Sequence, residues 1–442
     1  MPTIDSVPSS PQQPGRAAAV VIGAGIAGIS TALALQARGL DVVVVEKGEV
    51  AAEQSSRNWG WCRQMGRDVR EIPLIKISLD LWRGMNARIG AETGFRECGI
   101  VYMNDTAEAQ AERVAWVEQH GRPHGLKTRI LSGAEVAELV PGSVTRFHGG
   151  IYTPDDGRAE PFIAVPAMAK FFQAQGGVIL TQCAARGIER SAGRVSAVVT
   201  ERGRIATDTA ILAGGYWSSR FLHNLGVRFP QLGVTTPVLR TAALDIGHER
   251  TFSGEKYAVR KRRDGGFTVA HNAMTLSEIT PSHFRYALDF LPLLKLEYSA
   301  LKISVGQRFL EEARYKRRWQ LDEATPFEAV RILDPAPSRS ILDEAYADLQ
   351  RAFPVFQGCG VVERWAGMID GTPDAVPVID AINDVPGLHM LSGLSGHGFG
   401  LGPGAGQLMA EIALGETPCV DATPFRFSRF GDGTGFNPTT GF

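Results

Sequence analysis

The sequence lacks an excess of charge of either sign. Its 442 residues include 46 Lys and Arg against 47 Asp and Glu, which gives a formal net charge of −1. A chain with so balanced a charge offers no electrostatic argument for binding nucleic acid or an anionic membrane. It also has no apolar run of the length that crosses a membrane. We therefore expect no nucleic-acid partner and no transmembrane segment.

The chain also lacks a pattern of cysteines that would imply disulfides or a metal site. Its five cysteines are odd in number, scattered, and never spaced as C-x-x-C. Such usage argues against a disulfide framework or a zinc site and is typical of a reducing cytosol. Residues 1–16 are rich in Pro and Ser and have no apolar core, so we expect a disordered tail rather than a signal peptide. These observations predict a cytoplasmic protein without a metal.

The stretch from residue 19 to residue 47 predicts a βαβ unit. Four apolar residues, Ala19 to Ile22, are typical of a buried strand. A glycine-rich turn then opens a helix that continues to about Arg38, where apolar residues recur at helical spacing. Val42 to Val45 form a second buried strand. Together these segments indicate an α/β fold.

The turn between the first strand and the helix has the spacing G-x-G-x-x-G. Gly23 permits the tight turn, Gly25 lets a diphosphate approach the backbone, and Gly28 lets the helix pack close to the strand. The helix N-terminus offers unpaired N–H groups to the phosphates. Glu46 ends the second strand where a carboxylate accepts hydrogen bonds from a ribose, and Ile26, Ala27 and Lys47 complete the motif. The unit predicts a dinucleotide site but does not separate FAD from NAD.

Three later stretches of the chain are also predicted to reach the dinucleotide site. The first is a loop of polar, aromatic and glycine residues directly after the second strand; the second is a buried strand that ends in small residues; the third is a strand that leads into a glycine-rich turn and a helix. Such segments bring backbone close to a ligand at the carboxyl ends of strands. The residues we expect to contact the cofactor are Ser56, Arg57, Asn58, Trp59, Ala213, Gly214, Trp217, Gly396, His397, Gly398, Phe399 and Gly400.

The segments between these stretches predict a second domain. We assign residues 17–60, 150–233 and 361–420 to a discontinuous cofactor domain. We assign 61–149 and 234–360 to a substrate domain, and 421–442 to a C-terminal tail. The Leu-rich segment 281–319 is expected to be mostly helical. It fits either a membrane-surface element or a helical cover on the substrate domain, and its frequent charges favour the cover.

Taken together, the motifs resemble those of the FAD-dependent D-amino-acid-oxidase, glycine-oxidase and sarcosine-oxidase superfamily. The resemblance covers residues 19–415. Its motifs are the first glycine turn with Glu46-Lys47, Ser56-Arg57-Asn58, Ala213-Gly-Gly-Tyr-Trp217-Ser, Trp365-Ala-Gly with Thr372-Pro373-Asp374 and Pro377, and Gly393-Leu-Ser-Gly396-His397-Gly398-Phe399. It implies a discontinuous Rossmann-like FAD-binding domain and a substrate domain with a mixed, largely antiparallel sheet and covering helices. It also implies oxidation of a carbon–nitrogen bond, with a hydride passing to flavin N5.

Departures from the family pattern bear on the substrate and the flavin. Ile369 stands where glycine- and D-amino-acid-oxidising members have an Arg that clamps the substrate carboxylate, and Asp370 follows where many members have Pro. Either Arg63 or Arg67 supplies that clamp, or the substrate presents a cation to Asp370. The position of a flavin-linking Cys in sarcosine oxidases is Gly367, so we expect non-covalent FAD.

Two further points stay open at this stage. His397 either acts beside the flavin or makes a structural hydrogen bond to its loop. The predicted hairpin strand at residues 266–271 has no Lys of the kind that activates oxygen in sarcosine oxidases. The acceptor is therefore oxygen or an electron carrier.

We accordingly expect an FAD-dependent oxidoreductase that acts on a small amino acid or amine. The first alternative, an NAD(P)-linked enzyme, would require a second complete G-x-G-x-x-G unit, and the sequence has none. The other alternative is an FAD-binding protein with a structural or regulatory role, because the family Arg is missing.

Overall fold

The structure, a computed structural model, describes residues 3–434 and residue 438. One half is built on a six-stranded sheet with the order β21-β22-β13-β1-β2-β9, in which β21 alone is antiparallel to its neighbour. The strands are β1 (Ala19–Ile22), β2 (Val42–Val45), β9 (Val178–Leu180), β13 (Ala210–Leu212), β21 (Val378–Ala381) and β22 (Leu388–Ser392). Both predicted strands of the βαβ unit are confirmed. They are buried throughout because layers cover both faces of the sheet.

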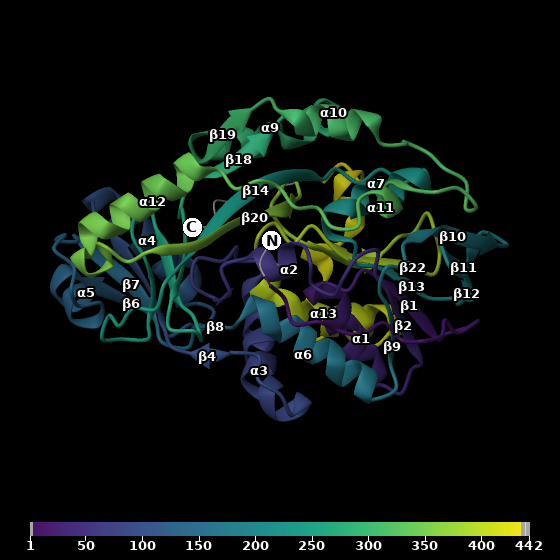
Figure 1. The fold of residues 1–442 in the computed structure, drawn as a ribbon, viewed down its shortest axis with the longest axis horizontal. Helices are drawn as coiled ribbons and strands as arrows, with labels where there is room; N and C mark the ends of the chain where they lie inside the picture. The colour runs from purple at the N-terminus through teal and green to yellow at the C-terminus, as the bar shows by residue number, and fades with distance from the viewer. Residues whose placement is uncertain (1–2, 435–437, 439–442) are drawn as a thin grey trace.

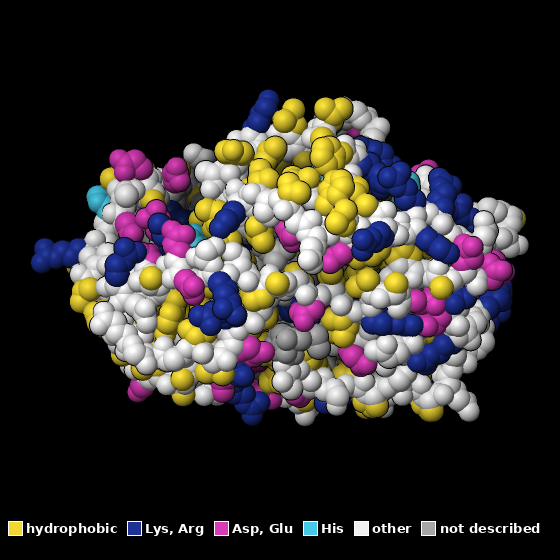
Figure 2. All heavy atoms as spheres, turned by 45° about the horizontal axis from the view of Figure 1, so that its top comes forward, with side chains coloured by type: hydrophobic (Ala, Val, Ile, Leu, Met, Phe, Trp, Pro, Cys, Tyr) yellow, Lys and Arg dark blue, Asp and Glu magenta, His cyan; other side chains and the backbone are white. Residues whose placement is uncertain are grey.

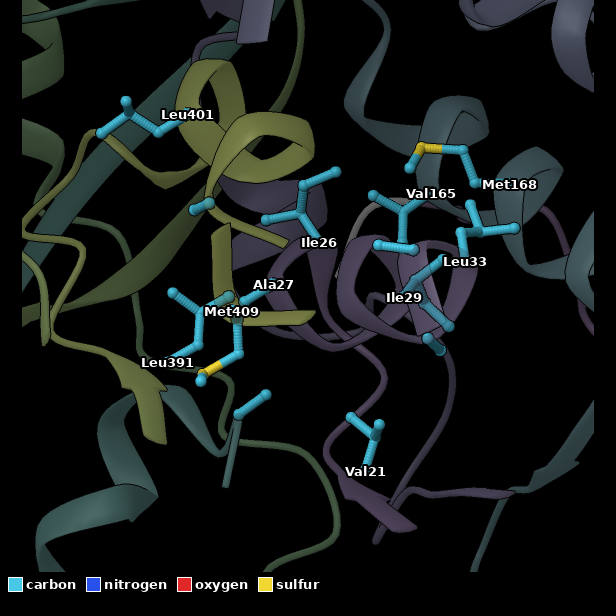
Figure 3. Packing of buried hydrophobic residues seen from close by; sticks show 14 of the residues in the cluster. Val21, Ile26, Ala27, Ile29, Leu33, Val165, Met168, Leu391, Leu401 and Met409 are labelled. Atoms are coloured by element: carbon cyan, nitrogen blue, oxygen red, sulfur yellow. The ribbon is translucent and has the colours of Figure 1, made fainter. Parts of the chain in front are cut away.

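Helices cover one face of this sheet (Figure 1). They are α1 (Ile26–Gln36), α6 (Pro161–Ala174) and α13 (Gly398–Leu414), and α3 (Ile72–Ile89) packs against α13. Figure 3 shows Ile29 and Leu33 of α1 near Val165 and Met168 of α6 in the shared apolar core. The other face carries an antiparallel sheet of β10 (Ala185–Ser191), β11 (Arg194–Thr200) and β12 (Gly203–Ala206).

The other half is built on a ten-stranded mixed sheet. Its order is β19-β18-β14-β17-β16-β15-β5-β7-β6, with β20 also paired to β14. Most pairs are antiparallel, whereas β5–β15 and β18–β19 are parallel. The strands are β5 (Ile100–Asn104), β6 (Arg129–Ser132), β7 (Gly149–Thr153), β14 (Leu232–Thr241), β15 (Thr251–Ser253), β16 (Ala258–Lys261), β17 (Phe267–Ala270), β18 (Thr275–Glu278), β19 (Leu301–Ser304) and β20 (Val361–Gly371). The predicted fold class is confirmed.

Short elements complete the fold. Leu342 and Leu349 of α12 (Arg339–Ala352) pack into the core under the ten-stranded sheet, and a small sheet of β3 (Trp61–Cys62), β8 (Gly157–Arg158) and β4 (Arg96–Glu97) joins the halves. The remaining α-helices are α2 (Gln54–Arg57), α4 (Ala107–Trp116), α5 (Gly133–Leu139), α7 (Ser218–Asn224), α8 (Pro281–Arg285), α9 (Ala287–Glu297), α10 (Gln307–Arg314) and α11 (Pro326–Ala329). A π-helical turn spans Val117–Gly121, and 3-10 turns span Gly215–Trp217, Tyr298–Ala300, Pro354–Phe356, Thr423–Phe425 and Phe427–Phe430. No helix in residues 3–434 is both long and apolar enough to cross a membrane.

The sheet pairing moves two segments relative to the boundaries predicted from the sequence. The strands β7 and β20 lie in the ten-stranded sheet, although both were assigned to the cofactor domain. The sequence predicts a strand over residues 361–365 and a loop over 367–374, but β20 continues to Gly371 because it pairs with β14 along its length. The glycines and polar residues of the second half gave no strand signal of their own, because its partner lies far away in the chain.

The N-terminal residues also differ from the expected disordered tail. Val7 is buried, the Ser10 amide donates to the carbonyl of Ile179 at 2.7 Å, and Arg16 forms a β-bridge with Ala206. The expected tail at the C-terminus is also attached at first, because Phe425 is buried and Arg429 pairs with Asp374. Residues 435–437 and 439–442 of that segment lie outside the described residues.

The segment 281–319 is not the packed helical cover that we expected. Strand β19 interrupts its helices and pairs with β18 at the edge of the ten-stranded sheet. Neither α8 nor α9 contains a buried residue. Figure 1 shows α9, α10 and β19 standing at the top of the molecule, above β14 and β18.

Candidate active site

The glycine turn after β1 is packed too closely for any side chain. Gly23 has φ +107°, and a Cβ there would lie 2.4 Å from the carbonyl oxygen of Ala213. A Cβ on Gly28 would lie 1.9 Å from the carbonyl oxygen of Gly23. Gly25 is the N-cap of α1 and provides no side-chain cap. The helix end therefore faces the space beyond β1 with its backbone N–H groups.

A cleft with about 900 Å³ of free space opens at the carboxyl ends of β1, β2, β13 and β22. All three predicted cofactor segments contribute to its lining. The predicted residues that line it are Gly23, Gly25, Ile26, Ala27, Glu46, Lys47, Asn58, Ala213, Gly214, Trp217, Asp370, Gly396, Gly398 and Phe399.

Other lining residues were not predicted. They are Ala51, Ala52, Glu53, Gln54, Ser55, Gly215, Tyr216, Met368, Leu391, Ser392 and Leu394. Ser55 accepts a hydrogen bond from the Ile26 amide at 2.8 Å, and the Oε1 atom of Gln54 is buried without a partner. An unpaired buried acceptor on a residue that lines a cleft is suited to a polar ligand. The position of both residues directly before Ser56 was the available sequence signal.

Glu46 and Lys47 close one end of the cleft. The carboxylate of Glu46 accepts hydrogen bonds from the amides of Ala24 and Gly48, each at 2.8 Å, and burial raises its pKa. The ammonium of Lys47 donates to Glu53 at 2.5 Å and lies 4.7 Å from the centre of the Trp217 ring. The charge of Lys47 is thus balanced within the protein, and Glu46 is fixed at the end of β2.

Several predicted cofactor residues hold the loop rather than line the cleft. Arg57 is buried, and its guanidinium donates to the carbonyl oxygens of Ala52 at 3.0 Å and Ala366 at 3.1 Å. Ser56 is buried and donates to Glu53, and Trp59 packs on Trp61 with ring centres 5.6 Å apart. These contacts tie the loop to β20 and to β3.

Gly367 belongs to the same junction between the loop and β20. A Cβ at this position would lie 2.0 Å from Oε1 of Gln54 and 3.0 Å from Cβ of Arg57. Residue 367 therefore has no room for a side chain unless Gln54 moves.

Glycines let α13 approach its neighbours on two sides. Cβ atoms on Gly402 and Gly406 would meet Ile26 and Ser30 of α1, and Cβ atoms on Gly400 and Gly404 would meet β3 and α3. The glycines of each pair are four residues apart and so share a helix face. The two pairs are offset by two residues and so lie on different faces. As a result α13 begins at Gly398, within the glycine-rich sequence rather than after it, and its positive end adjoins the cleft.

A buried charged cluster lies beside this helix end. Nδ1 of His397, the N-cap of α13, is 2.9 Å from Oε2 and 3.1 Å from Oε1 of Glu71. Burial lowers the pKa of His397, and Glu71 opposes this shift. Arg67 is 3.8 Å from Glu71, and burial together with the nearby Arg63 lowers its pKa to about 10. The cluster brings together three of the predicted site residues.

Arg63 and Arg67 differ in how their guanidinium groups are used. Arg63 donates to the Met65 carbonyl and lies 5.7 Å from the centre of the Tyr102 ring. Arg67 is buried and donates through Nε to the Arg63 carbonyl at 3.0 Å, but its Nη1 has no hydrogen-bond partner. Arg67 thus retains a donor for a ligand.

The structure adds an arginine that sequence reasoning missed. Arg260 on β16 is buried, and it donates to Glu160 at 2.8 Å and to Thr268 at 3.0 Å. Its Nε has no partner and lies beside Gly60. Arg67 lies with Cys62 beside Gly400, and Arg260 lies beside Gly60, so both arginines adjoin the segment that leads into β3. An arginine on a hairpin strand gave no signal that it would be buried there.

Other residues of the protein form hydrogen bonds to the carboxylate of Asp370. Its Oδ2 accepts hydrogen bonds from the Gly393 amide at 2.8 Å and from the Ser392 hydroxyl at 3.3 Å, and Gln231 lies at 3.5 Å. Burial raises the pKa of Asp370 to about 6, although the backbone hydrogen bonds oppose this shift. These contacts favour a role in holding the turn after β22 over recognition of a substrate cation.

The substitution Asp370→Asn should therefore change stability rather than amine binding. The raised pKa means that the folded carboxyl charges at a cost, so this contribution to stability is present below about pH 4 and lost as the pH rises to 6. An amide at this position cannot ionise, so the stability of the D370N variant relative to wild type should rise by about 2 kcal/mol between pH 4 and 7. Urea unfolding at the two pH values measures this change. A tenfold loss of affinity for carboxylate-free amines would instead assign Asp370 to the substrate.

Both the sequence and the fold of this chain match those of known proteins. A family model described as FAD dependent oxidoreductase (DAO) matches residues 18–412. The chain belongs to this family. It is similar to the structure of L-amino acid deaminase from Proteus myxofaciens in complex with anthranilate, with 33% identity and a TM-score of 0.93 over 97% of each chain. L-amino acid deaminase from Proteus vulgaris is 32% identical, with a TM-score of 0.92 over 96% of this chain and 100% of that one. A glycine oxidase from Pseudomonas aeruginosa is 26% identical over 92% of this chain and 97% of the relative.

Membership of this family settles the class of reaction. The chain is an FAD-dependent oxidoreductase that oxidises carbon–nitrogen bonds of amino acids or amines, as the sequence predicted. The relatives named here are enzymes, and nothing supports a purely structural or regulatory flavoprotein. FAD rather than NAD(P) is the cofactor. The unpaired Gln54 acceptor and the glycine turn without room for side chains fit a dinucleotide in the cleft.

Proposed function

We propose that the protein is an FAD-dependent deaminase of α-amino acids. In this proposal, buried arginines receive the substrate carboxylate beside the cofactor cleft. One observation carries it: Arg67 and Arg260 each retain a buried nitrogen without a hydrogen-bond partner, since Glu71 lies too far from Nη1 of Arg67, at 3.8 Å, for a hydrogen bond. Both adjoin the same segment, because Arg67 lies with Cys62 beside Gly400, and Arg260 lies beside Gly60. A buried, unpaired donor on a cation is costly unless a ligand anion meets it. Ile369 stands where other family members have the Arg that binds the substrate carboxylate. In this protein Arg67 and Arg260 would bind the carboxylate instead.

The local charge is consistent with a carboxylate. Glu160 pairs with Arg260, and Glu71 lies closer to His397 than to Arg67. Asp156 also adjoins Arg67, but burial raises its pKa to about 7, so it balances the arginines only in part at neutral pH. Guanidinium groups bind carboxylates bidentately and strongly when water is excluded. The two Proteus relatives are L-amino acid deaminases, which supports the L-isomer as substrate.

The residues of the cleft have distinct roles in this proposal. The glycine turn and the N-terminus of α1 would hold the diphosphate, and Glu46 would accept hydrogen bonds from a ribose. When bound, FAD supplies the oxidation by taking a hydride at N5. The positive end of α13 would stabilise the negative charge that the ring gains. Gly367 provides no sulfur and no space for one, which supports non-covalent binding.

The substrate must meet the site with a neutral amine, because its lone pair assists loss of the hydride from the adjacent carbon. The buried arginines favour this by binding the carboxylate and disfavouring a neighbouring ammonium cation. The product is an imine, which hydrolyses to an oxo acid and ammonia. The chain needs no strong acid–base pair for this sequence.

An anaerobic visible titration of the purified holoprotein tests the proposal. The panel would contain L- and D-amino acids, N-methyl amino acids and polyamines. We expect L-amino acids to bleach the flavin, and an aromatic carboxylate to shift its spectrum without bleaching it. Bleaching only by amines without a carboxylate would contradict the proposal. Admission of air, or of an artificial electron carrier, then shows which acceptor restores the colour.

A further inference from the structure

Side chains of α3 are hydrogen-bonded to the backbone of α13 close to its start. Pro403 has no N–H, so α13 lacks the helical hydrogen bond that would reach back to the carbonyl of Phe399. At the next position, the hydroxyl of Ser78 donates to the Gly400 carbonyl at 2.6 Å and accepts from the Gly404 amide at 3.0 Å. A side chain of α3 thus joins two backbone groups that bond to each other in a regular helix.

Trp82, one turn further along α3, supports the same part of α13. Its indole N–H donates to the Gly400 carbonyl at 3.1 Å, so this carbonyl accepts hydrogen bonds from two side chains of α3. The Trp82 ring also packs on Phe399, which lines the cofactor cleft, with ring centres 5.4 Å apart. Ser78 and Trp82 are both fully buried, so water does not compete for these contacts.

A third contact joins the starts of the two helices, which lie next to each other in Figure 1. Glu71, the N-cap of α3, is 2.9 Å from Nδ1 of His397, the N-cap of α13. Residue 71 precedes Ser78 by seven positions, and Ser78 precedes Trp82 by four, so all three share one face of α3. The first turn of α13 is therefore held by a single face of its neighbour.

Buried groups, rather than exposed charges, are expected to set the electrostatic potential in the cleft. On the face that Figure 2 shows, Lys and Arg side chains are mixed with Asp and Glu side chains. Exposed charges are also largely screened by salt beyond about 10 Å, whereas buried groups are screened much less. The direction of the first turn of α13 therefore matters for a charge that develops in the cleft.

We propose that Ser78 and Trp82 are positioning residues that set the redox potential of the flavin. They would aim the positive end of α13 at the part of the ring that gains negative charge on reduction. Neither residue is among those that line the cleft, so each would act through α13. The inference rests on the role proposed above for this helix end, but not on the identity of the substrate.

Reduction of the holoprotein in equilibrium with a redox dye tests this inference without any amino acid. The variant Ser78→Ala/Trp82→Phe should bind reduced flavin, relative to oxidised flavin, about tenfold less well than the wild type does. For a two-electron couple, this factor lowers the midpoint potential by about 30 mV. Its size lies in the upper part of the range for charges at helix ends. Each single variant should shift the potential less, in the same direction.

Ser30→Ala/Trp319→Phe is the matched control, because it makes the same two substitutions at buried positions. Ser30 of α1 lies beside Gly406 of α13, but its hydroxyl has no hydrogen-bond partner. Trp319 donates to the carbonyl of Arg186 at 2.7 Å, on the other face of the six-stranded sheet. The control should keep the potential of the wild type.

Melting temperature and flavin content, measured in every variant, separate a shift in potential from a general loss of stability. The proposal is overturned if the variants of Ser78 and Trp82 retain flavin and keep the potential of the wild type, or if the control shifts it as far. If the double variant loses its flavin, Ser78→Ala alone, which removes one oxygen atom, decides in the same way. Failure of L-amino acids to bleach the flavin would contradict the proposed function and leave this inference standing.

Discussion

Gly28→Ala should abolish retention of FAD and destabilise the protein by several kcal/mol, whereas Gly84→Ala should stabilise it. Both glycines lie inside helices, α1 and α3, so the substitution is the same in its local effect. In an open helix, Ala is better than Gly by roughly 0.5–1 kcal/mol. A Cβ on Gly84 would meet nothing within 4 Å, and one on Gly28 would meet the carbonyl oxygen of Gly23 at 1.9 Å. The α1 helix would have to move away from β1 and carry the diphosphate-binding turn with it.

Thermal unfolding and the flavin content of the purified variants measure both effects. Gly84→Ala should raise the melting temperature and keep a full complement of flavin. Gly28→Ala should lower the melting temperature and give a protein that adding FAD does not restore to colour. If Gly28→Ala retained flavin and stability, the close packing of α1 on β1 would not be a requirement of the site.

The parts of the fold that sequence reasoning predicted are those whose determinants are local. The βαβ unit depends on two apolar runs, three glycines and one acid within about 30 residues. The residues of each element therefore also indicate which element comes next. The capping box Ser132-x-x-Glu135, another local signal in the sequence, starts α5. Where a strand depends on a distant partner, as the second half of β20 depends on β14, its own residues carried too little signal.

The candidate site divides in the same way. Residues that contact the cofactor cleft through the backbone, such as Gly25 and Gly396, were predictable because only glycine fits such turns. The roles of individual side chains were harder to predict from the sequence. Arg57 was expected at the cofactor but ties the loop to β20, and Arg260 was not expected at all. Whether an arginine is buried and unpaired depends on packing between two sheets, which no local pattern records.

Substitutions of Arg67 and Arg260 are expected to have the second of the two largest effects. Arg67→Met and Arg260→Lys should each lower kcat/KM for an L-amino acid by roughly a hundredfold or more. Loss of one partner of a buried, hydrogen-bonded charge pair costs about 2–5 kcal/mol, and each 1.4 kcal/mol is about tenfold in rate. Lysine at position 260 keeps a charge for Glu160 while removing the planar fork, so the fold is spared the cost of an unpaired buried acid.

Arg63→Met is the matched control, because Arg63 already donates to the carbonyl of Met65 and is less buried than Arg67. Its kcat/KM should fall less than tenfold. The affinity for an aromatic carboxylate without an amine, measured from the change in the flavin spectrum, should fall in the Arg67 and Arg260 variants and not in the control. The affinity for the carboxylate separates a lost carboxylate contact from a general disturbance of the fold. A variant that only loosens the loop around Cys62 would alter flavin binding but would keep its preference for carboxylated ligands. If the Arg67 and Arg260 variants kept that affinity, the carboxylate would be bound elsewhere, and the two unpaired donors would serve only the packing of the two sheets.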